Sequence, residues 1–336
     1  MKAYELRETK GVDGIVLNPE RPTPKPGPGE VLIKVRAVSL NYRDLVVASG
    51  HYPSSIKPAV IPLSDGAGDV AAVGAGVSEF KVGDRVAGTF FQGWISGATC
   101  AETTGQALGG AVDGMLAEYV VLPQTGVIGV PSHLSFEEAA TLPCAGLTAW
   151  NAVVETGRIR AGQTVLLLGT GGVSLFALQF ARMHGARTIL TSSSNEKLAR
   201  AKALGAEVLI NYREKPEWDQ EVLRLTGGRG TDLIVEVGGA GTLERSIRSV
   251  RVGGTIALVG LVAGLGQIDP LPIIGRAIRL QGIYVGSREM FAAMNRAITQ
   301  AQLHPVVDRV FDFDAAKSAY AYLASGAHFG KIVIRV

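Results

Sequence analysis

A glycine-rich turn, GTGGV at residues 169–173, stands between a short apolar run and a helical pattern. Glycines permit a tight turn and let backbone N–H groups approach a phosphate, and the dipole of the helix that follows favours negative charge. The order strand, turn, helix and second strand over residues 165–206 is typical of a dinucleotide-binding βαβ unit. One position departs from the pattern, because Ser174 replaces its third glycine. We predict that the pyrophosphate of a nucleotide cofactor binds to Gly169, Thr170, Gly171, Gly172 and Val173.

The second strand of this unit ends in uncharged residues, TSSSN at positions 191–195. An NAD-binding unit usually carries an acidic residue there to hold the ribose hydroxyls, and a carboxylate would repel the 2′-phosphate of NADP. Lys197 can supply a positive charge, and Tyr212 ends the third strand at the same adenosine edge. The sequence therefore favours NADPH over NADH, with an adenosine site made by Ser192, Ser193, Lys197 and Tyr212.

The elements around the turn predict an α/β protein with two domains, for which 336 residues are long enough. Short β-patterned runs with turn signals before residue 127 predict a small antiparallel barrel. From 128 to 287, six strands alternate with helical or loop segments, as in a doubly wound parallel sheet. The tail from 288 to 336 has mixed elements and is expected to pack on the first domain. We therefore expect a cofactor domain at 128–287 and a second domain made by 1–127 with 288–336.

Composition excludes several classes of protein. The net charge of +3 is dispersed, with no basic run, so we expect no nucleic acid partner. Cys100 and Cys144 are too few for a disulfide framework. No apolar stretch is long enough to cross a bilayer, and the first residues lack the apolar core of a signal peptide. We expect a cytoplasmic protein that acts on a small molecule and contacts no membrane.

Several motifs together resemble the medium-chain dehydrogenase/reductase superfamily over the whole chain. They are VGDRV at 82–86, AATLPCAGLTAW at 139–150, the glycine turn and the C-terminal GKIVI. The segments SLNYRDL, SGHYP and IPLSDGAGDV are most similar to a zinc-free branch of quinone-oxidoreductase-like and alcohol dehydrogenase-like proteins. The resemblance implies a GroES-like β-barrel domain, a Rossmann domain and an active site in the cleft between them.

The same resemblance indicates whether the chain binds zinc. Zinc alcohol dehydrogenases similar to this chain have a Cys, a His-Glu pair and a second Cys at the positions of Asn41, of Ser64 and Asp65, and of Cys144. Asn and Ser are poor replacements for thiolate and imidazole, so we expect no catalytic zinc. The lobe that binds structural zinc with four cysteines is also missing, since residues 91–110 hold Cys100 alone. Cys144 is then a small, buried apolar residue beside the cofactor.

Without a Lewis acid, the easier substrates are quinones and α,β-unsaturated carbonyls, in which the charge after hydride transfer is delocalised. The resemblance places Asn41 and Tyr52 in the substrate pocket. We expect Tyr52 to donate a proton or hydrogen bond, or else only to line the pocket, and Asn41 to hold a carbonyl or the nicotinamide ribose. Asp44 is interpreted as structural, bonding backbone N–H groups in a polar turn.

Further cofactor contacts follow from the resemblance alone. They are Thr148, Val237, Gly238, Val259 and Gly260. Enoyl-reductase modules of the superfamily carry a Lys where this chain has Leu261, which argues against an acyl-carrier substrate. In similar enzymes the sixth strand of the cofactor domain, here near Leu280–Gly286, pairs with its copy, so we expect a homodimer.

The sequence thus predicts a zinc-independent, NADPH-dependent reductase of activated C=C bonds or quinones. Two alternatives stay open. One is an NADP-dependent alcohol dehydrogenase or carbonyl reductase that works without zinc. The other is an NADP-binding protein without catalytic activity.

Overall fold

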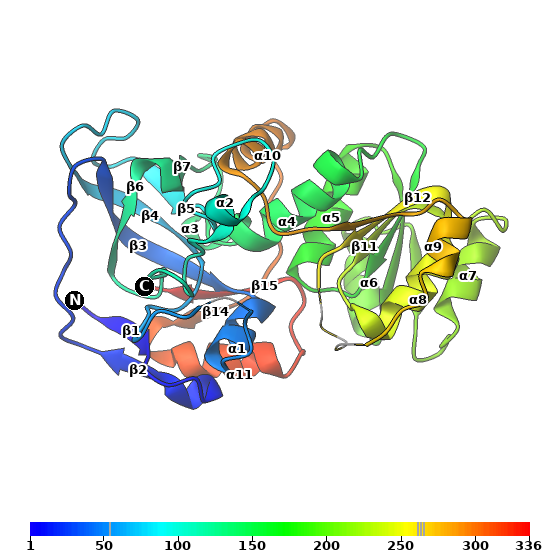
Figure 1. The fold of residues 1–336 in the computed structure, drawn as a ribbon, viewed down its shortest axis with the longest axis horizontal. Coiled ribbons are helices and arrows are strands. Elements are labelled where there is room, and N and C mark those ends of the chain that lie inside the picture. Colours follow the sequence, from blue (N-terminus) through cyan, green and yellow to red (C-terminus); the bar gives the residue numbers. More distant parts are fainter. Residues whose placement is uncertain (54, 261, 263, 265) are drawn as a thin grey trace. The chain divides into compact units, whose positions relative to one another are not determined.

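The computed structural model describes residues 1–53, 55–260, 262, 264 and 266–336. The chain forms two compact units, Met1–Leu147 with Gly286–Val336, and Thr148–Val285 (Figure 1). The expected ranges differ from these units mainly at the first crossing, because residues 128–147 group with the first unit and not with the cofactor domain, as do residues 286 and 287 at the second crossing. Helix α3 (Phe136–Ala139) explains the difference, since it packs on strands β3 and β4 of the first unit.

The first unit is built on a seven-stranded sheet in the order β14-β15-β3-β4-β5-β7, with β6 also paired to β3. Its pairs are antiparallel except β14 with β15, so the expected antiparallel barrel is completed by a parallel pair from the tail. A separate antiparallel pair is formed by β1 (Ala3–Leu6) and β2 (Ile15–Asn18). The seven strands are β3 (Glu30–Leu40), β4 (Asp65–Val73), β5 (Arg85–Gly88), β6 (Tyr119–Pro123), β7 (Val127–Gly129), β14 (Val307–Asp312) and β15 (Lys331–Arg335).

Alternation of apolar and polar residues explains the long strand β3, whose buried Val31, Ile33 and Val35 face one side. These side chains belong to one core with residues of β4, β6 and α11. Helix α1 contacts α11, and both lie beside the strands of the first unit in Figure 1. The helices of this unit are α1 (Tyr42–Ala48), α2 (Ala101–Thr104), α3, α10 (Arg288–Ala301) and α11 (Ala316–Ala324).

The second unit has the expected six-stranded parallel sheet, in the order β10-β9-β8-β11-β12-β13. Its central strands are buried on both faces, as in a doubly wound sheet, which explains continuous apolar runs such as VLLL. The strands are β8 (Thr164–Leu168), β9 (Arg187–Ser192), β10 (Val208–Asn211), β11 (Thr231–Glu236), β12 (Val250–Leu258) and β13 (Arg279–Gly282).

Helices connect these strands. They are α5 (Gly172–Met183), α6 (Asn195–Ala203), α7 (Trp218–Leu225), α8 (Ala240–Ser249) and α9 (Leu271–Gly275). The segment that enters this unit contains α4 (Leu147–Trp150) between two π-helical turns, Leu142–Gly146 and Asn151–Thr156. Among the described residues, no helix has the length and apolar character needed to span a membrane.

Candidate active site

The start of helix α1 carries the residues from which the first candidate site is built. Asn41 follows the last residue of β3 and has extended backbone angles, as a residue before a helix does. Its backbone N–H donates to Asp44 Oδ2 at 2.8 Å. This bond confirms the expectation that Asp44 bonds a backbone N–H group, although the segment is the first turn of helix α1 and not the polar turn expected there. The bond fixes Asn41 at the end of the strand.

Lys331, the first residue of β15, is buried beside Asn41 because β15 pairs antiparallel with the end of β3. Its Nζ donates to Asn41 Oδ1 at 2.6 Å and also to the carbonyl of Leu40. Burial lowers the pKa of Lys331, and Asp65, Cys144 and Asp44 oppose that change. Because Oδ1 accepts from an ammonium, the orientation of the Asn41 amide is fixed. Its Nδ2 has no acceptor in ordinary hydrogen-bond geometry among the described residues, although the Asn41 side chain lies close enough to Asp65 to lower the pKa of that carboxyl.

Asp65, the first residue of β4, supplies a buried carboxylate to the same place. It accepts from Ser64 Oγ at 2.7 Å and from the backbone N–H of Cys144 at 3.2 Å. Burial raises its pKa, against the effects of Lys331, Asn41, Ser64 and Cys144. A carboxylate and an ammonium therefore share one buried environment, in which each reduces the cost of burying the other.

Arg43 is the second buried cation of the site. Its Nη1 lies 3.2 Å from Asp44 Oδ1 and donates to the carbonyl of Leu108 at 2.9 Å. The guanidinium carbon is 4.8 Å from the ring centre of Tyr52 and 4.9 Å from that of Phe90. Burial raises the pKa of Asp44 to about 6, although Arg43, the Asn41 N–H and Lys331 act against it. We call Asn41, Arg43, Asp44, Asp65, Cys144 and Lys331 the polar cluster.

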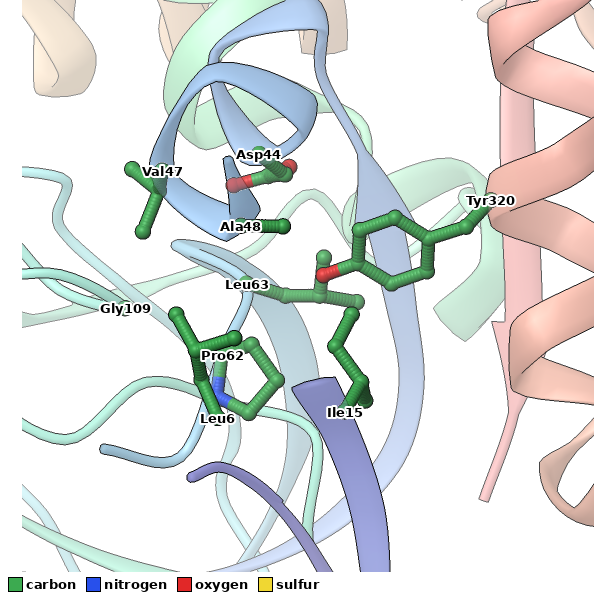
Figure 2. Close-up of a pocket in the computed structure, with 9 residues that line it drawn as sticks. All are labelled: Leu6, Ile15, Asp44, Val47, Ala48, Pro62, Leu63, Gly109 and Tyr320. Atoms are coloured by element: carbon green, nitrogen blue, oxygen red, sulfur yellow. The ribbon is translucent and has the colours of Figure 1, made fainter. Parts of the chain in front are cut away.

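Asp44 also borders an interior gap with Tyr320 of α11, shown in Figure 2. The Tyr320 ring reaches toward Leu63 there, and the Asp44 carboxylate lies on the same side of the gap as Ala48. The gap admits no water molecule. It is a packing defect of the core and not a ligand site.

The side chains of the polar cluster and of the adjoining Ser64 do not fit a catalytic zinc ion. The Asn41 oxygen accepts from an ammonium, and the Ser64 hydroxyl donates to Asp65. Burial, and Asp65 next to it, raise the pKa of the Cys144 thiol far above its usual range, and Cys144 is the one thiol in the cluster. No group of three or more His, Cys, Asp or Glu side chains suited to a metal ion occurs in the described part of the chain.

The other residues predicted for the first site are less enclosed. Tyr52 is partly buried and packs against the core of the first unit. Tyr42, adjacent to Asn41, is exposed. The structure thus links both residues to the polar cluster, Asn41 through its bond with Lys331 and Tyr52 through its contact with Arg43. The sequence analysis missed Arg43 and Lys331. The only signal for them was that each is a charged residue inside an apolar or turn segment.

The glycine turn of the second unit lies where the sequence places it, between β8 and α5. Gly169 has φ 77°, in the left-handed region that favours glycine, and its N–H donates to the Thr191 carbonyl at 2.9 Å. A Cβ at Gly169 or Gly171 would meet nothing within 4 Å, so space lies over both residues. Ser174, in place of the third glycine, is buried and donates to the Leu168 carbonyl at 2.6 Å. That bond ties helix to strand, so the substitution preserves the close packing that the glycine usually provides.

The predicted adenosine residues surround the ends of β9 and β10. Ser192 is the last residue of β9, and its carbonyl accepts from the Tyr212 N–H at 3.1 Å. Ser194 caps α6 and accepts from the backbone N–H of Lys197 at 3.3 Å. Glu214 is an acid that the sequence analysis missed.

Two amide side chains hold the Glu214 carboxylate at this edge. Asn195 donates to its Oε1 at 2.6 Å and Asn211 donates to the same oxygen at 3.1 Å. Asn211 also donates to Asn195 Oδ1 at 2.7 Å. A carboxylate is therefore held next to the first residue of α6, although it comes from the loop after β10 and not from the end of β9.

The ends of β11 and β12 hold four more predicted cofactor residues: Val237, Gly238, Val259 and Gly260. Val259 N–H donates to the Glu236 carbonyl at 2.8 Å, and a Cβ at Gly260 would lie 2.4 Å from the Val237 carbonyl oxygen. Gly260 is therefore required by the close approach of the two strand ends. Thr148 is buried in α4, and Leu261 lies outside the described residues.

Two family models match the chain. An "Alcohol dehydrogenase GroES-like domain" matches residues 27–132 and a "Zinc-binding dehydrogenase" domain matches residues 172–300. A "zinc-type alcohol dehydrogenase-like protein" of Schizosaccharomyces pombe is 46% identical over 93% of this chain and 92% of its own length. The "Quinone oxidoreductase" of Rattus norvegicus is 29% identical over 99% of this chain and 97% of its own.

Solved structures agree over the full chain. A putative alcohol dehydrogenase from Sinorhizobium meliloti has TM-score 0.93 and 40% identity, covering 100% of this chain and 98% of that one. An "NAD-dependent alcohol dehydrogenase" has TM-score 0.91 and 36% identity, and a mycobacterial protein complexed with NADPH has 0.84 and 30%, each covering both chains completely. From the motifs, the two domains and these relatives, we conclude that the chain is an enzyme, an oxidoreductase that belongs to the medium-chain dehydrogenase/reductase superfamily.

Proposed function

We propose that this enzyme uses NADPH to reduce an activated C=C bond or a quinone, without zinc. The observation that carries the proposal is the bond from the Lys331 ammonium to Asn41 Oδ1, within a set of donors that does not fit zinc. A site that holds fixed cations and hydrogen-bond donors suits substrates whose negative charge is delocalised after hydride transfer.

Residues of the first unit would bind and protonate the substrate. Asn41 Nδ2 is the donor atom of its amide and has no acceptor in ordinary hydrogen-bond geometry among the described residues, so it is our candidate for holding the substrate oxygen. Tyr52 is our candidate for the proton donor to the enolate or phenolate. NADPH would supply the hydride when bound to the glycine turn at Gly169–Val173.

The proposed preference for NADPH rests on the adenosine edge. Ser192 and Ser193 are uncharged, and Lys197 lies in the first turn of α6 beside them. Glu214 works against this preference, because a carboxylate near the 2′-phosphate is repulsive. Two similar solved structures differ in their cofactor, since one is titled NAD-dependent and the other is complexed with NADPH.

A second candidate is an NADP-dependent alcohol dehydrogenase or carbonyl reductase, favoured by the printed names of several relatives. The two candidates separate in one experiment, in which the purified enzyme is offered quinones and enones with NADPH, and primary and secondary alcohols with NADP. We expect consumption of NADPH with the first set. Oxidation of alcohols at a higher kcat/KM than any enone or quinone reduction would establish the second candidate instead.

Tyr52→Phe tests the assigned donor, because it keeps the ring and removes only the hydroxyl. A general acid contributes about 10²- to 10⁴-fold, so kcat for an enone or quinone should fall at least roughly tenfold with NADPH affinity intact. An unchanged kcat would reassign proton delivery to water.

We also propose a cytoplasmic homodimer. Both cysteines are free, as is usual in a reducing compartment. Among the described residues, strand β13 pairs with β12 alone, so its other edge can pair with a second copy. Light scattering should give twice the mass of the chain at micromolar concentration; the mass of one chain would contradict the dimer.

A further inference from the structure

Arg43 is a buried cation, and the proposed mechanism assigns it no role. Its side chain is 10% exposed, and Nη1 donates to Asp44 and to the Leu108 carbonyl. A side-chain hydrogen bond with Tyr52 also contributes to the raised pKa of Arg43. Nε and Nη2 are buried, and neither has an acceptor in ordinary hydrogen-bond geometry among the described residues. Buried guanidinium groups normally satisfy their donors, so an acceptor that came closer to these two groups would be stabilised by them.

Tyr52 is placed to provide that acceptor. The Arg43 guanidinium carbon lies over its ring at 4.8 Å and over the Phe90 ring at 4.9 Å. Phe90 is itself held edge-on against Phe91, with ring centres 4.7 Å apart. At Gly110 an added Cβ would come within 3.0 Å of Arg43 Nη2, so the glycine leaves room for the guanidinium. The cation is thus held against the phenol by packing on several sides.

The charges around this pair are nearly balanced. The charged groups besides Arg43 are Asp44 on α1, Asp65 on β4 and Lys331 on β15. The Cys144 thiol and the Tyr320 hydroxyl are neutral titratable groups. Burial disfavours the charge on Arg43, but Asp44, Tyr52 and Cys144 outweigh burial and raise its pKa. Arg43 therefore remains charged whenever Tyr52 titrates. A nearby cation favours a phenolate over a phenol, and it interacts more strongly with an electron-rich ring.

We propose that Arg43 is a positioning residue that sets the acidity of Tyr52, stabilising the phenolate formed when Tyr52 gives up its proton. In that step the Tyr52 O–H bond breaks, the proton goes to the enolate or phenolate of the reduced substrate, and the electron pair stays on the Tyr52 oxygen. Nε and Nη2 are then available to donate to that oxygen, and a proton from water restores the phenol. The inference rests on the proposed role of Tyr52 as the donor.

The test is a direct titration of Tyr52. Tyrosinate formation is followed by ultraviolet difference absorbance, and the curve of the Tyr52→Phe variant is subtracted to isolate Tyr52. The double variant Arg43→Met/Asp44→Asn removes the cation without leaving a buried carboxylate unpaired, and should raise the Tyr52 pKa by about 1 or more. Asp44→Asn alone leaves the cation without its counter-charge and should lower it. Arg43→Lys should keep it near the wild-type value.

Arg85→Met is the matched control. Arg85 also lies over an aromatic ring, with its guanidinium carbon 4.4 Å from the ring centre of Phe136, and it should leave the Tyr52 titration unchanged. The alkaline limb of the pH profile of kcat should move with the Tyr52 titration in each variant.

Two outcomes separate this inference from the proposed function. A Tyr52 titration that stays the same in the double variant and in Asp44→Asn would overturn the role of Arg43, and Asp44→Asn alone decides the matter if the double variant does not fold. If Tyr52→Phe keeps its kcat while the titration shifts as expected, Arg43 does tune Tyr52 but Tyr52 is not the proton donor.

Discussion

The polar cluster of the first unit and the glycine turn of the second unit are built in opposite ways. The turn is made by backbone from five consecutive residues, and its geometry depends on a positive φ at Gly169. The cluster is made by side chains from α1, β4, the Leu142–Gly146 turn and β15, far apart in sequence. A backbone site tolerates change in its neighbours, whereas a site made of buried charges depends on each of them.

Loss of Lys331 should be the largest effect in this comparison. Lys331→Met leaves the Asp65 carboxylate buried without its cation and should lower the free energy of unfolding by about 3–5 kcal/mol, measured in urea. The double variant Lys331→Met/Asp65→Asn should recover much of the loss. Lys317→Met, an exposed lysine on α11, should change stability by less than about 0.5 kcal/mol. Equal effects of the two lysines would mean that the cluster has no electrostatic coupling.

The pH dependence of stability should reveal Asp44. Its pKa is raised from 3.8 to about 6 in the folded chain, so the unfolded chain loses this proton first as pH rises. The contribution of Asp44 to the free energy of unfolding is complete below about pH 4. It falls by up to about 3 kcal/mol as the pH rises through 6. Unfolding free energies at several pH values should therefore fall less in Asp44→Asn than in the wild type. The same pH dependence in both proteins would contradict the burial of a titrating Asp44.

The same contrast applies at the adenosine edge, where we propose that side chains select NADPH over NADH, whereas the backbone of the glycine turn would bind either cofactor. If Lys197 contacts the 2′-phosphate, Lys197→Ala should weaken NADPH binding by about 10- to 150-fold, with NADH nearly unchanged. Lys202→Ala, later on the same helix, is the control. Fluorescence titration of the two cofactors measures both affinities, and an equal loss for both would mean that Lys197 does not contact the phosphate.

Glu214→Gln should give the smallest change, in the opposite direction. It removes a carboxylate that Asn195 and Asn211 hold at this edge, and should tighten NADPH a few-fold with little effect on NADH. Tighter binding of both cofactors, or of neither, would exclude Glu214 from the discrimination.

The two regions also differ in how much of them could be predicted from sequence. Local sequence patterns predict the glycine turn, the six strands and their parallel arrangement. The structure confirms all three. Even Ser174, an apparent departure, makes a local bond across six residues. Local signals suffice where a site is built from neighbouring residues.

The polar cluster could be predicted only in part. Asn41 came from the resemblance to a family, but its partner Lys331 is 290 residues away and reads as the start of an ordinary strand. Only the pairing of β15 with β3 brings the two together. Arg43 and Glu214 were missed for the same reason, since their partners Tyr52, Leu108 and Asn195 lie in other elements or turns.

Metal analysis tests the central claim most directly, because the proposed chemistry depends on fixed cations and not on zinc. The enzyme is purified mildly, its zinc content is measured, and reduction of an enone or quinone by NADPH is assayed before and after treatment with a chelator. We predict no stoichiometric zinc and unchanged activity after chelation. About one zinc per chain, with activity lost to the chelator and restored by the metal, would contradict the account.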